Sequence, residues 1–168
     1  MVGVPLLVVL YLRGVRLTPL VYILASIHAM ILMVGGKYTY AQVPPFNWLR
    51  DALHLSRNHY DRLGHFAQGF VPAMIAREVL LRTSRLRPGK WLFFLVLCVC
   101  GALSACYELV EWAVAAVSGS AADAFLGTQG DPWDTQKDMA LAFLGAITAQ
   151  LLLSRVQDCQ VKRLRPNE

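Results

Sequence analysis

The sequence places an aspartate and a histidine, Asp61 and His65, four positions apart. On a helix this spacing puts both side chains on one face. A carboxylate and an imidazole in that arrangement can chelate a cation, or the carboxylate can orient the imidazole for proton transfer. The structural alternative is a hydrogen bond between the two side chains, with the carboxylate at the start of a helix.

Two glutamates, Glu108 and Glu111, lie three positions apart in the longest apolar run of the chain. Their spacing puts both carboxylates on nearly the same helical face. A carboxylate at the centre of a bilayer costs about 3 kcal/mol on insertion scales, so an acid in such a segment favours a functional interpretation. The alternatives are a buried Glu108 paired with a base such as Arg62, and a Glu111 that simply reaches the membrane surface.

A third pair, Asp134 and Asp138, opens the last apolar segment and again has a spacing of four. The connection before it, FLGTQGDPWDTQKD, has glycines where a tight turn needs them and polar residues that could line a site. Asp134 or Thr135 could also cap the helix that follows, with Asp138 in its first turn. Helix capping beside a solvated loop is therefore the alternative to a functional pair.

The elements that position these residues must be membrane spans. The chain has 168 residues, of which 56% are hydrophobic and 16% charged, with a mean hydropathy of +0.45. A soluble domain is about 25% charged, so this composition excludes an ordinary soluble fold, a disordered chain and a disulfide-rich mini-protein. Four segments approach the length of about 20 residues that a helix needs to cross a bilayer, namely 17–36, 63–81, 91–117 and 139–153.

The expected fold is all-α, because backbone groups in lipid need partners within their own segment. We predict a polytopic transmembrane helical bundle that forms a single domain over residues 1–168. The apolar stretch 1–12 is too short to span, so we expect an interfacial helix or part of a span there. Pro44 and Pro45 are expected to break the connection between the first and second spans.

Basic residues mark one side of the membrane. Alternating spans put three basic clusters on the same side, and the positive-inside rule makes that side cytoplasmic. We therefore expect the N-terminus of the first full span and the C-terminus to be cytoplasmic, and we interpret the net charge of +5 as an orientation signal, not as a nucleic-acid partner. The clusters hold ten of the sixteen bases: Arg13, Arg16, Arg82, Arg85, Arg87, Lys90, Arg155, Lys162, Arg163 and Arg165.

Most acids and histidines then fall on the outer side, where three helices present them at one depth. This coincidence predicts a polar site at the outer membrane face. The catalytic candidates are Asp61, His65, Glu108, Glu111, Asp134 and Asp138. A divalent cation such as Mg²⁺, Mn²⁺ or Zn²⁺ would bind Asp61, His65, Glu108 and Asp138. The candidates for substrate binding are Tyr38, Tyr40, Arg57, Asn58, Arg62, Gln129 and Asp131.

Four sequence blocks resemble the YjdF-like inner-membrane proteins, a family of unknown function: KYTYAQVP (37–44), RNHYDRLGHFAQGF (57–70), YELVEW (107–112) and FLGTQGDPWDTQKDM (125–139). More distantly, the order D-x-x-x-H, then E, then D resembles the VanZ-like membrane proteins. The resemblance implies a multi-spanning bacterial inner-membrane protein with Asp61, His65, Glu108, Asp134 and Asp138 on the motif positions. Lys37 and Gln42 depart from the family pattern HYTYAEVP, so a ligand or base is altered here if that histidine and glutamate contribute to the family's site.

The favoured function is a metal-assisted or acid–base enzyme that acts on a lipid-linked substrate. One alternative is a lipid or small-molecule binder or transporter that uses the same acids as cation or proton sites. Another is a structural accessory subunit whose polar residues hold the helices together. The sequence has no nucleophile elbow, phosphate loop or HExxH motif, so it indicates no particular reaction.

Overall fold

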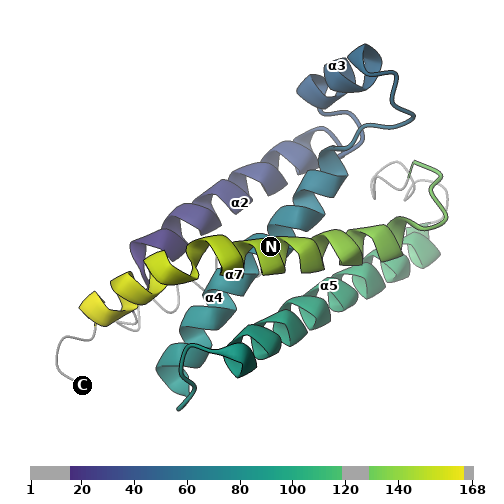
Figure 1. The fold of residues 1–168 in the computed structure, drawn as a ribbon. Coiled ribbons are helices and arrows are strands. Elements are labelled where there is room, and N and C mark those ends of the chain that lie inside the picture. The colour runs from purple at the N-terminus through teal and green to yellow at the C-terminus, as the bar shows by residue number, and fades with distance from the viewer. Residues whose placement is uncertain (1–15, 119–128, 165–168) are drawn as a thin grey trace.

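The computed structural model describes residues 16–118 and 129–164. Within them all regular structure is helical (Figure 1), which confirms the predicted all-α class. The expected short helix at 1–12 and the acid Asp123 lie outside the described residues. The helices are α2 (Pro19–Lys37), α3 (Pro44–Ala52), α4 (Tyr60–Thr83), α5 (Lys90–Ser118) and α7 (Asp134–Leu164).

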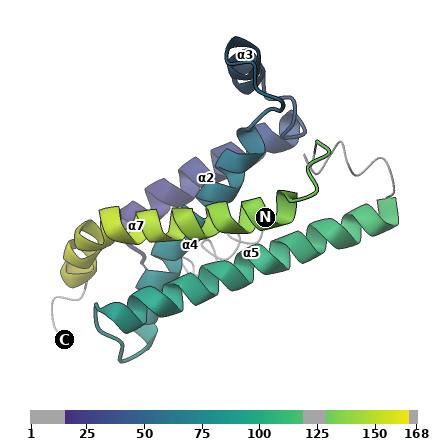
Figure 2. The same ribbon diagram turned by 45° about the vertical axis from the view of Figure 1, so that its right-hand side comes forward.

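Three helices, α2, α5 and α7, are long and apolar enough to cross a membrane. The predicted span 63–81 lies within α4, which has 24 residues but a more polar composition and does not belong to that group. Figures 1 and 2 show α4 among the other long helices, and it packs against all three of them. Neighbouring helices therefore shield the polar side chains of α4.

The closest helix pair is α4 with α7, and small residues bring their main chains together. A methyl group at Gly69 would overlap the main-chain carbonyl of Ala142, and one at Gly145 would overlap the carbonyl of Phe66. Ala142 and Ala146 are almost completely buried on the same face of α7. Close packing through glycine and alanine is typical of helices in membranes, and here it fixes the start of α7 against α4.

The helix α7 extends beyond the predicted span 139–153 at both ends. Its last turns are polar, but they have partners on other helices. The fully buried Gln157 donates to the main-chain oxygen of Met74 at 2.7 Å, and Gln160 accepts from the N–H of Leu20 at 3.0 Å. The helix continues past its apolar segment because α4 and α2 satisfy these side chains.

Glu78 connects the start of α2 to the end of α4 at one end of the bundle. Its carboxylate is fully buried and accepts the N–H of Thr18 at 2.9 Å, the hydroxyl of Thr18 at 2.6 Å and Arg82 Nη1 at 3.0 Å. Arg82 also donates to the carbonyl of Arg16. Each hydrogen-bond site of this buried acid is used, so Glu78 is a structural residue.

The sequence did not predict that Pro44 and Pro45, besides interrupting the connection after α2, begin the helix α3. Proline suits the first helical positions, where its missing N–H has no partner to lose. Figures 1 and 2 show α3 standing off the end of the bundle, and its Trp48 is 73% exposed.

Candidate functional site

Two arginines near the start of α4 hold the start of α7. Arg57 donates to Asp134 Oδ1 at 2.7 Å, while Arg62 donates to Asp134 Oδ1 at 2.9 Å and to Asp131 Oδ2 at 3.0 Å. None of these side chains is more than 15% exposed. We call Arg57, Arg62, Asp131 and Asp134 the arginine–aspartate network. Its charges are paired, so it joins the two helices electrostatically.

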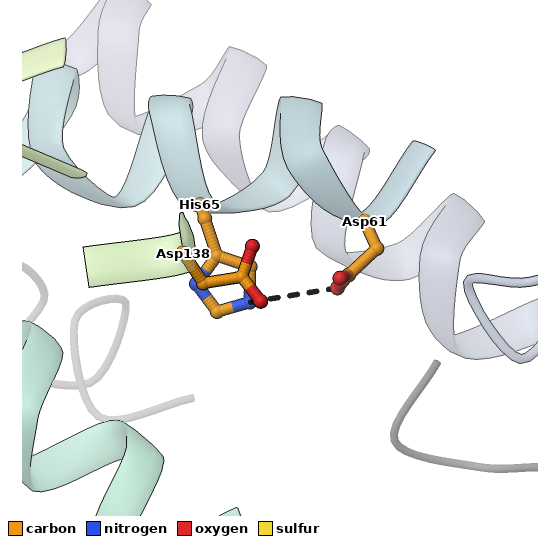
Figure 3. Close-up of side chains that lie close together, drawn as sticks. All are labelled: Asp61, His65 and Asp138. Carbon is orange, nitrogen blue, oxygen red and sulfur yellow. Dashed lines mark ion pairs between the residues drawn. The ribbon is translucent and has the colours of Figure 1, made fainter. Parts of the chain in front are cut away.

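The second group, the histidine cluster, contains Asp61, His65, Glu108, Glu111 and Asp138. His65 Nε2 lies 3.5 Å from Asp61 Oδ1 and 3.8 Å from Asp138 Oδ2, and Nδ1 lies 3.6 Å from Glu108 Oε1. Figure 3 shows the imidazole with the two aspartates, which come from α4 and α7. Asp61, His65, Glu108 and Asp138 are each at most 7% exposed. Three helices therefore surround one buried imidazole with carboxylates.

Arg62 connects the two groups, because its Nη1 donates to Asp138 Oδ1 at 2.8 Å. The sequence allowed a structural pair between Arg62 and Glu108, but Arg62 pairs with three aspartates instead. Within the described part of the chain, the recorded ion-pair partner of Glu108 is His65. Glu108 is thus part of the histidine cluster and not of the arginine–aspartate network.

Several buried polar atoms of this region have no hydrogen-bond partner among the described residues. They are Asp61 Oδ2, His65 Nδ1, Glu108 Oε1 and Ser104 Oγ. A buried polar group left without a partner costs about 1–3 kcal/mol, and more when it is charged. His65 Nδ1 and Glu108 Oε1 face each other at 3.6 Å, and Asp61 Oδ2 lies 3.6 Å from Arg57 Nη2, so these atoms are ion-paired but lack a hydrogen bond. A bound ligand or water would supply the missing hydrogen bonds.

Carboxylates also outnumber bases across the two groups. With all six carboxylates ionised, only Arg57, Arg62 and Lys137 are permanently positive, which leaves three negative charges. Protonation of His65 would still leave two. Charge that is buried without compensation is expensive, so such a group of carboxylates either takes up protons or binds a cation. The carboxylates are those of Asp61, Glu108, Glu111, Asp131, Asp134 and Asp138.

Nearby charges shift the pKa values of two titratable side chains at the edge of these groups, Asp131 and His59. A hydrogen bond from Lys137 at 2.7 Å and the N–H of Trp133 lower the pKa of Asp131 below its usual value. Burial, followed by the positive charges of Arg57 and Arg62, lowers the pKa of His59. Asp131 is therefore ionised and His59 neutral at pH 7.

Asn58 and Gln129, two of the proposed substrate-binding residues, connect neighbouring segments through hydrogen bonds. The N–H of Asn58 donates to Gln129 Oε1 at 3.0 Å, and Gln129 Nε2 donates back to the carbonyl of Asn58 at 3.0 Å. The Asn58 amide also donates to Asn47 at 2.8 Å and to the carbonyl of Val43 at 3.1 Å. This pattern connects the segments before α3, before α4 and before α7 around the site.

The two tyrosines of the first block differ. Lys37 Nζ lies 5.3 Å from the centroid of the Tyr38 ring, so Tyr38 packs against a lysine. Tyr40 turns back over the end of α2 with a φ of 53°, and its hydroxyl donates weakly to the carbonyl of Leu32 at 3.4 Å. Burial, and then the charge of Asp61, raises the pKa of Tyr40 from 10.0 to about 12. Tyr40 is therefore a neutral phenol near the histidine cluster.

Sequence reasoning missed two residues at this site. Tyr107 packs edge-on against His65 with ring centroids 5.9 Å apart. Ser104 is fully buried, one helical turn before Glu108. On the same face of α5, Cys100 Sγ lies 3.7 Å from the carbonyl of Gly69. The spacing of four between Ser104 and Glu108 was the signal that could have identified the serine.

A family model described as "Predicted membrane protein (DUF2238)" matches residues 1–159. The inner membrane protein YjdF of Escherichia coli (strain K12) is 55% identical over 151 residues, which cover 90% of this chain and 72% of that protein. No solved structure matches. The more distant resemblance to VanZ-like proteins stays a prediction. Together with the three apolar helices of membrane-spanning length, these matches support a location in the bacterial inner membrane, and the chain belongs to the DUF2238 family of predicted membrane proteins.

Proposed function

We propose that this membrane protein is an enzyme whose histidine cluster acts on a lipid-linked substrate at the outer face of the bacterial inner membrane. One observation carries the proposal: a carboxylate faces each ring nitrogen of the buried His65. An imidazole held between carboxylates is a common basis for both proton transfer and metal-assisted chemistry.

The depth of the cluster supports a lipid-linked substrate. His65 lies about 8 Å into α4 and Asp138 about 6 Å into α7, at 1.5 Å per helical residue. The headgroup layer of a bilayer is about 5–8 Å thick on each side. With the starts of α4 and α7 at the membrane surface, as we propose, the polar head of a membrane lipid would reach the cluster without leaving the membrane.

The distribution of charge supports the orientation. The bundle end that contains the histidine cluster is the one opposite Glu78, and the basic connections lie near Glu78. The positive-inside rule assigns the basic end to the cytoplasm, so we propose that the histidine cluster faces the periplasm and that the C-terminus is cytoplasmic.

The buried polar atoms without a hydrogen bond argue against a purely structural role for the histidine cluster. A structural cluster such as that around Glu78 uses its acceptors fully, whereas Asp61, His65 and Glu108 each keep a buried atom without a hydrogen bond. Protein stability alone gives no reason to retain such atoms on two helices, α4 and α5.

Membrane lipids from a strain lacking the gene test this proposal by mass spectrometry. We expect a lipid-linked species to change in abundance, and to return to its normal level with the unmodified gene or with Asp51→Asn, an exposed acid outside the site. At equal protein level, His65→Ala should fail to restore it. Lipid profiles that are identical in all strains, or full restoration by His65→Ala, would contradict the proposal.

A further inference from the structure

We propose that Asp61, His65 and Asp138 bind one divalent transition-metal ion, and that Glu108 orients the imidazole from its other nitrogen. This inference rests on the proposed function, because it names the cofactor of the same site. One imidazole nitrogen and two carboxylate oxygens suit Zn²⁺, Mn²⁺ or Co²⁺ better than Ca²⁺, which prefers oxygen ligands alone. Three protein ligands leave a position open for water or substrate, as in catalytic zinc sites.

The donor atoms have the required spacing. One ligand atom from each of Asp61, His65 and Asp138 lies within 4.8 Å of the others. Around a bound ion, ligand atoms at about 2.1 Å from the metal are about 3–4 Å apart. His65 Nε2 is already 3.5 Å from Asp61 Oδ1 and 3.8 Å from Asp138 Oδ2. Figure 3 shows the three side chains converging from α4 and α7.

Each ligand is supported by a different neighbour on its far side. Arg62 donates to Asp138 Oδ1 at 2.8 Å and leaves Oδ2 facing the imidazole. Arg57 Nη2 lies 3.6 Å from Asp61 Oδ2, so Oδ1 faces the imidazole. Glu108 Oε1 lies 3.6 Å from His65 Nδ1. Metal ligands in proteins are usually oriented by such outer partners, and a carboxylate on the second histidine nitrogen is the commonest arrangement.

A further buried polar group without a hydrogen bond lies on α5, the helix that supplies Glu108. Ser104 is fully buried and its hydroxyl has no hydrogen-bond partner among the described residues. Ser104 shares a helical face with Glu108, and Cys100 on that face contacts α4 at Gly69. A bound water would satisfy this otherwise costly buried group.

The carboxylates of α5 offer a second possible arrangement. His65, Glu108 and Glu111 also place ligand atoms within 4.8 Å of one another. The imidazole binds a single ion through one nitrogen while the other donates its N–H, so the two arrangements exclude each other for one metal. We assign the metal to Nε2 because its ligands are all buried and both aspartates have arginine partners, whereas Glu111 is only half-buried.

Metal binding by the purified full chain tests the assignment. The protein is freed of metal with a chelator, loaded with Co²⁺ and desalted, and its metal content and visible absorption are measured. We expect one Co²⁺ per chain. Asp138→Asn and His65→Ala should lose the ion, and Glu108→Gln should weaken binding by about 10–100-fold while keeping the absorption band. Glu111→Gln and the control Asp51→Asn should bind as the unmodified chain does.

Three results would overturn the proposal. They are less than stoichiometric Co²⁺ and Zn²⁺ in the unmodified protein, retention of the ion by Asp138→Asn, or its loss from Glu111→Gln. The first result stands whether or not the variants fold, and circular dichroism and gel filtration check the folding of each variant. A metal-free protein that still restores the lipid profile would refute the metal site alone. A metal-binding protein that leaves lipids unchanged would refute the proposed enzyme alone.

Discussion

Two buried glutamates in this molecule have opposite surroundings. Glu78 accepts three strong hydrogen bonds from Thr18 and Arg82. Glu108 is similarly buried, but its Oε1 has no hydrogen bond and its recorded ion-pair partner is an imidazole 3.6 Å away. The residue type and the membrane setting are the same, so the difference lies in the partners. Glu78 stabilises the bundle, whereas Glu108 faces the imidazole of His65.

Tyr40 gives a prediction about pH. Burial and the charge of Asp61 raise its pKa from 10.0 to about 12. A raised folded-state pKa means that its contribution to stability is complete below pH 10 and is lost as the pH rises toward 12. The ultraviolet absorbance of tyrosinate, measured as the difference between the protein and Tyr40→Phe, should show one phenol that ionises near pH 12. Ionisation of that phenol near pH 10 would contradict this assignment.

The sequence predicted which residues gather at the candidate site, from their spacing along each helix and their common depth, but not how their side chains pair. The spacing of four between Asp61 and His65 and the position of Glu108 in an apolar run were sufficient to select them. The partner of each arginine could not be predicted, because Arg62 reaches aspartates 69 to 76 positions away in the chain. Such pairs depend on how helices pack, and helix spacing carries no information about that.

At the scale of helices, the contact of α4 with α7 positions the site, because it brings His65 and Asp138 together. A methyl group at Gly69 would meet the main chain of Ala142, which cannot move aside as a side chain could. Gly69→Ala should therefore lower the free energy of unfolding by about 3 kcal/mol, the upper part of the range for overpacking. Thermal unfolding in detergent measures the change.

Gly36→Ala is the matched control, because a methyl group there meets no atom within 4 Å. It should leave stability unchanged or raise it by up to about 1 kcal/mol, since alanine favours helix more than glycine does. Equal changes in the free energy of unfolding for the two substitutions would contradict the close contact between α4 and α7.

The apolar pattern predicted the long helices well because a membrane span needs a continuous apolar segment. The sequence placed the start of α7 at Asp134 or Thr135, close to its observed start at Asp134, but did not predict its last turns or the helix α3. The last turns of α7 are stabilised by Gln157 and Gln160 through partners on other helices. Two prolines at the start of α3 favour helix initiation as much as chain breaking, so local signals alone were ambiguous there.

At the scale of the whole molecule, the chain has a basic end and an end with excess carboxylate. The exposed Cys159 lies near the basic end, in the last turns of α7. If this end is cytoplasmic, as the positive-inside rule implies, a membrane-impermeant maleimide should label Cys159 in inverted membrane vesicles but not in intact spheroplasts. Loss of the label in Cys159→Ser identifies the thiol. Labelling in spheroplasts would reverse the proposed orientation and put the histidine cluster in the cytoplasm.

We propose that the histidine cluster is retained for chemistry at a cost in stability. The most direct test is the melting temperature of chelator-treated Glu108→Gln beside that of Glu78→Gln. Removing the charge of Glu108 relieves a buried excess of carboxylate, so its melting temperature should stay the same or rise. Glu78→Gln breaks a buried ion pair and should lose about 3 kcal/mol. A fall for Glu108→Gln as large as that for Glu78→Gln would contradict the claim and make the cluster structural.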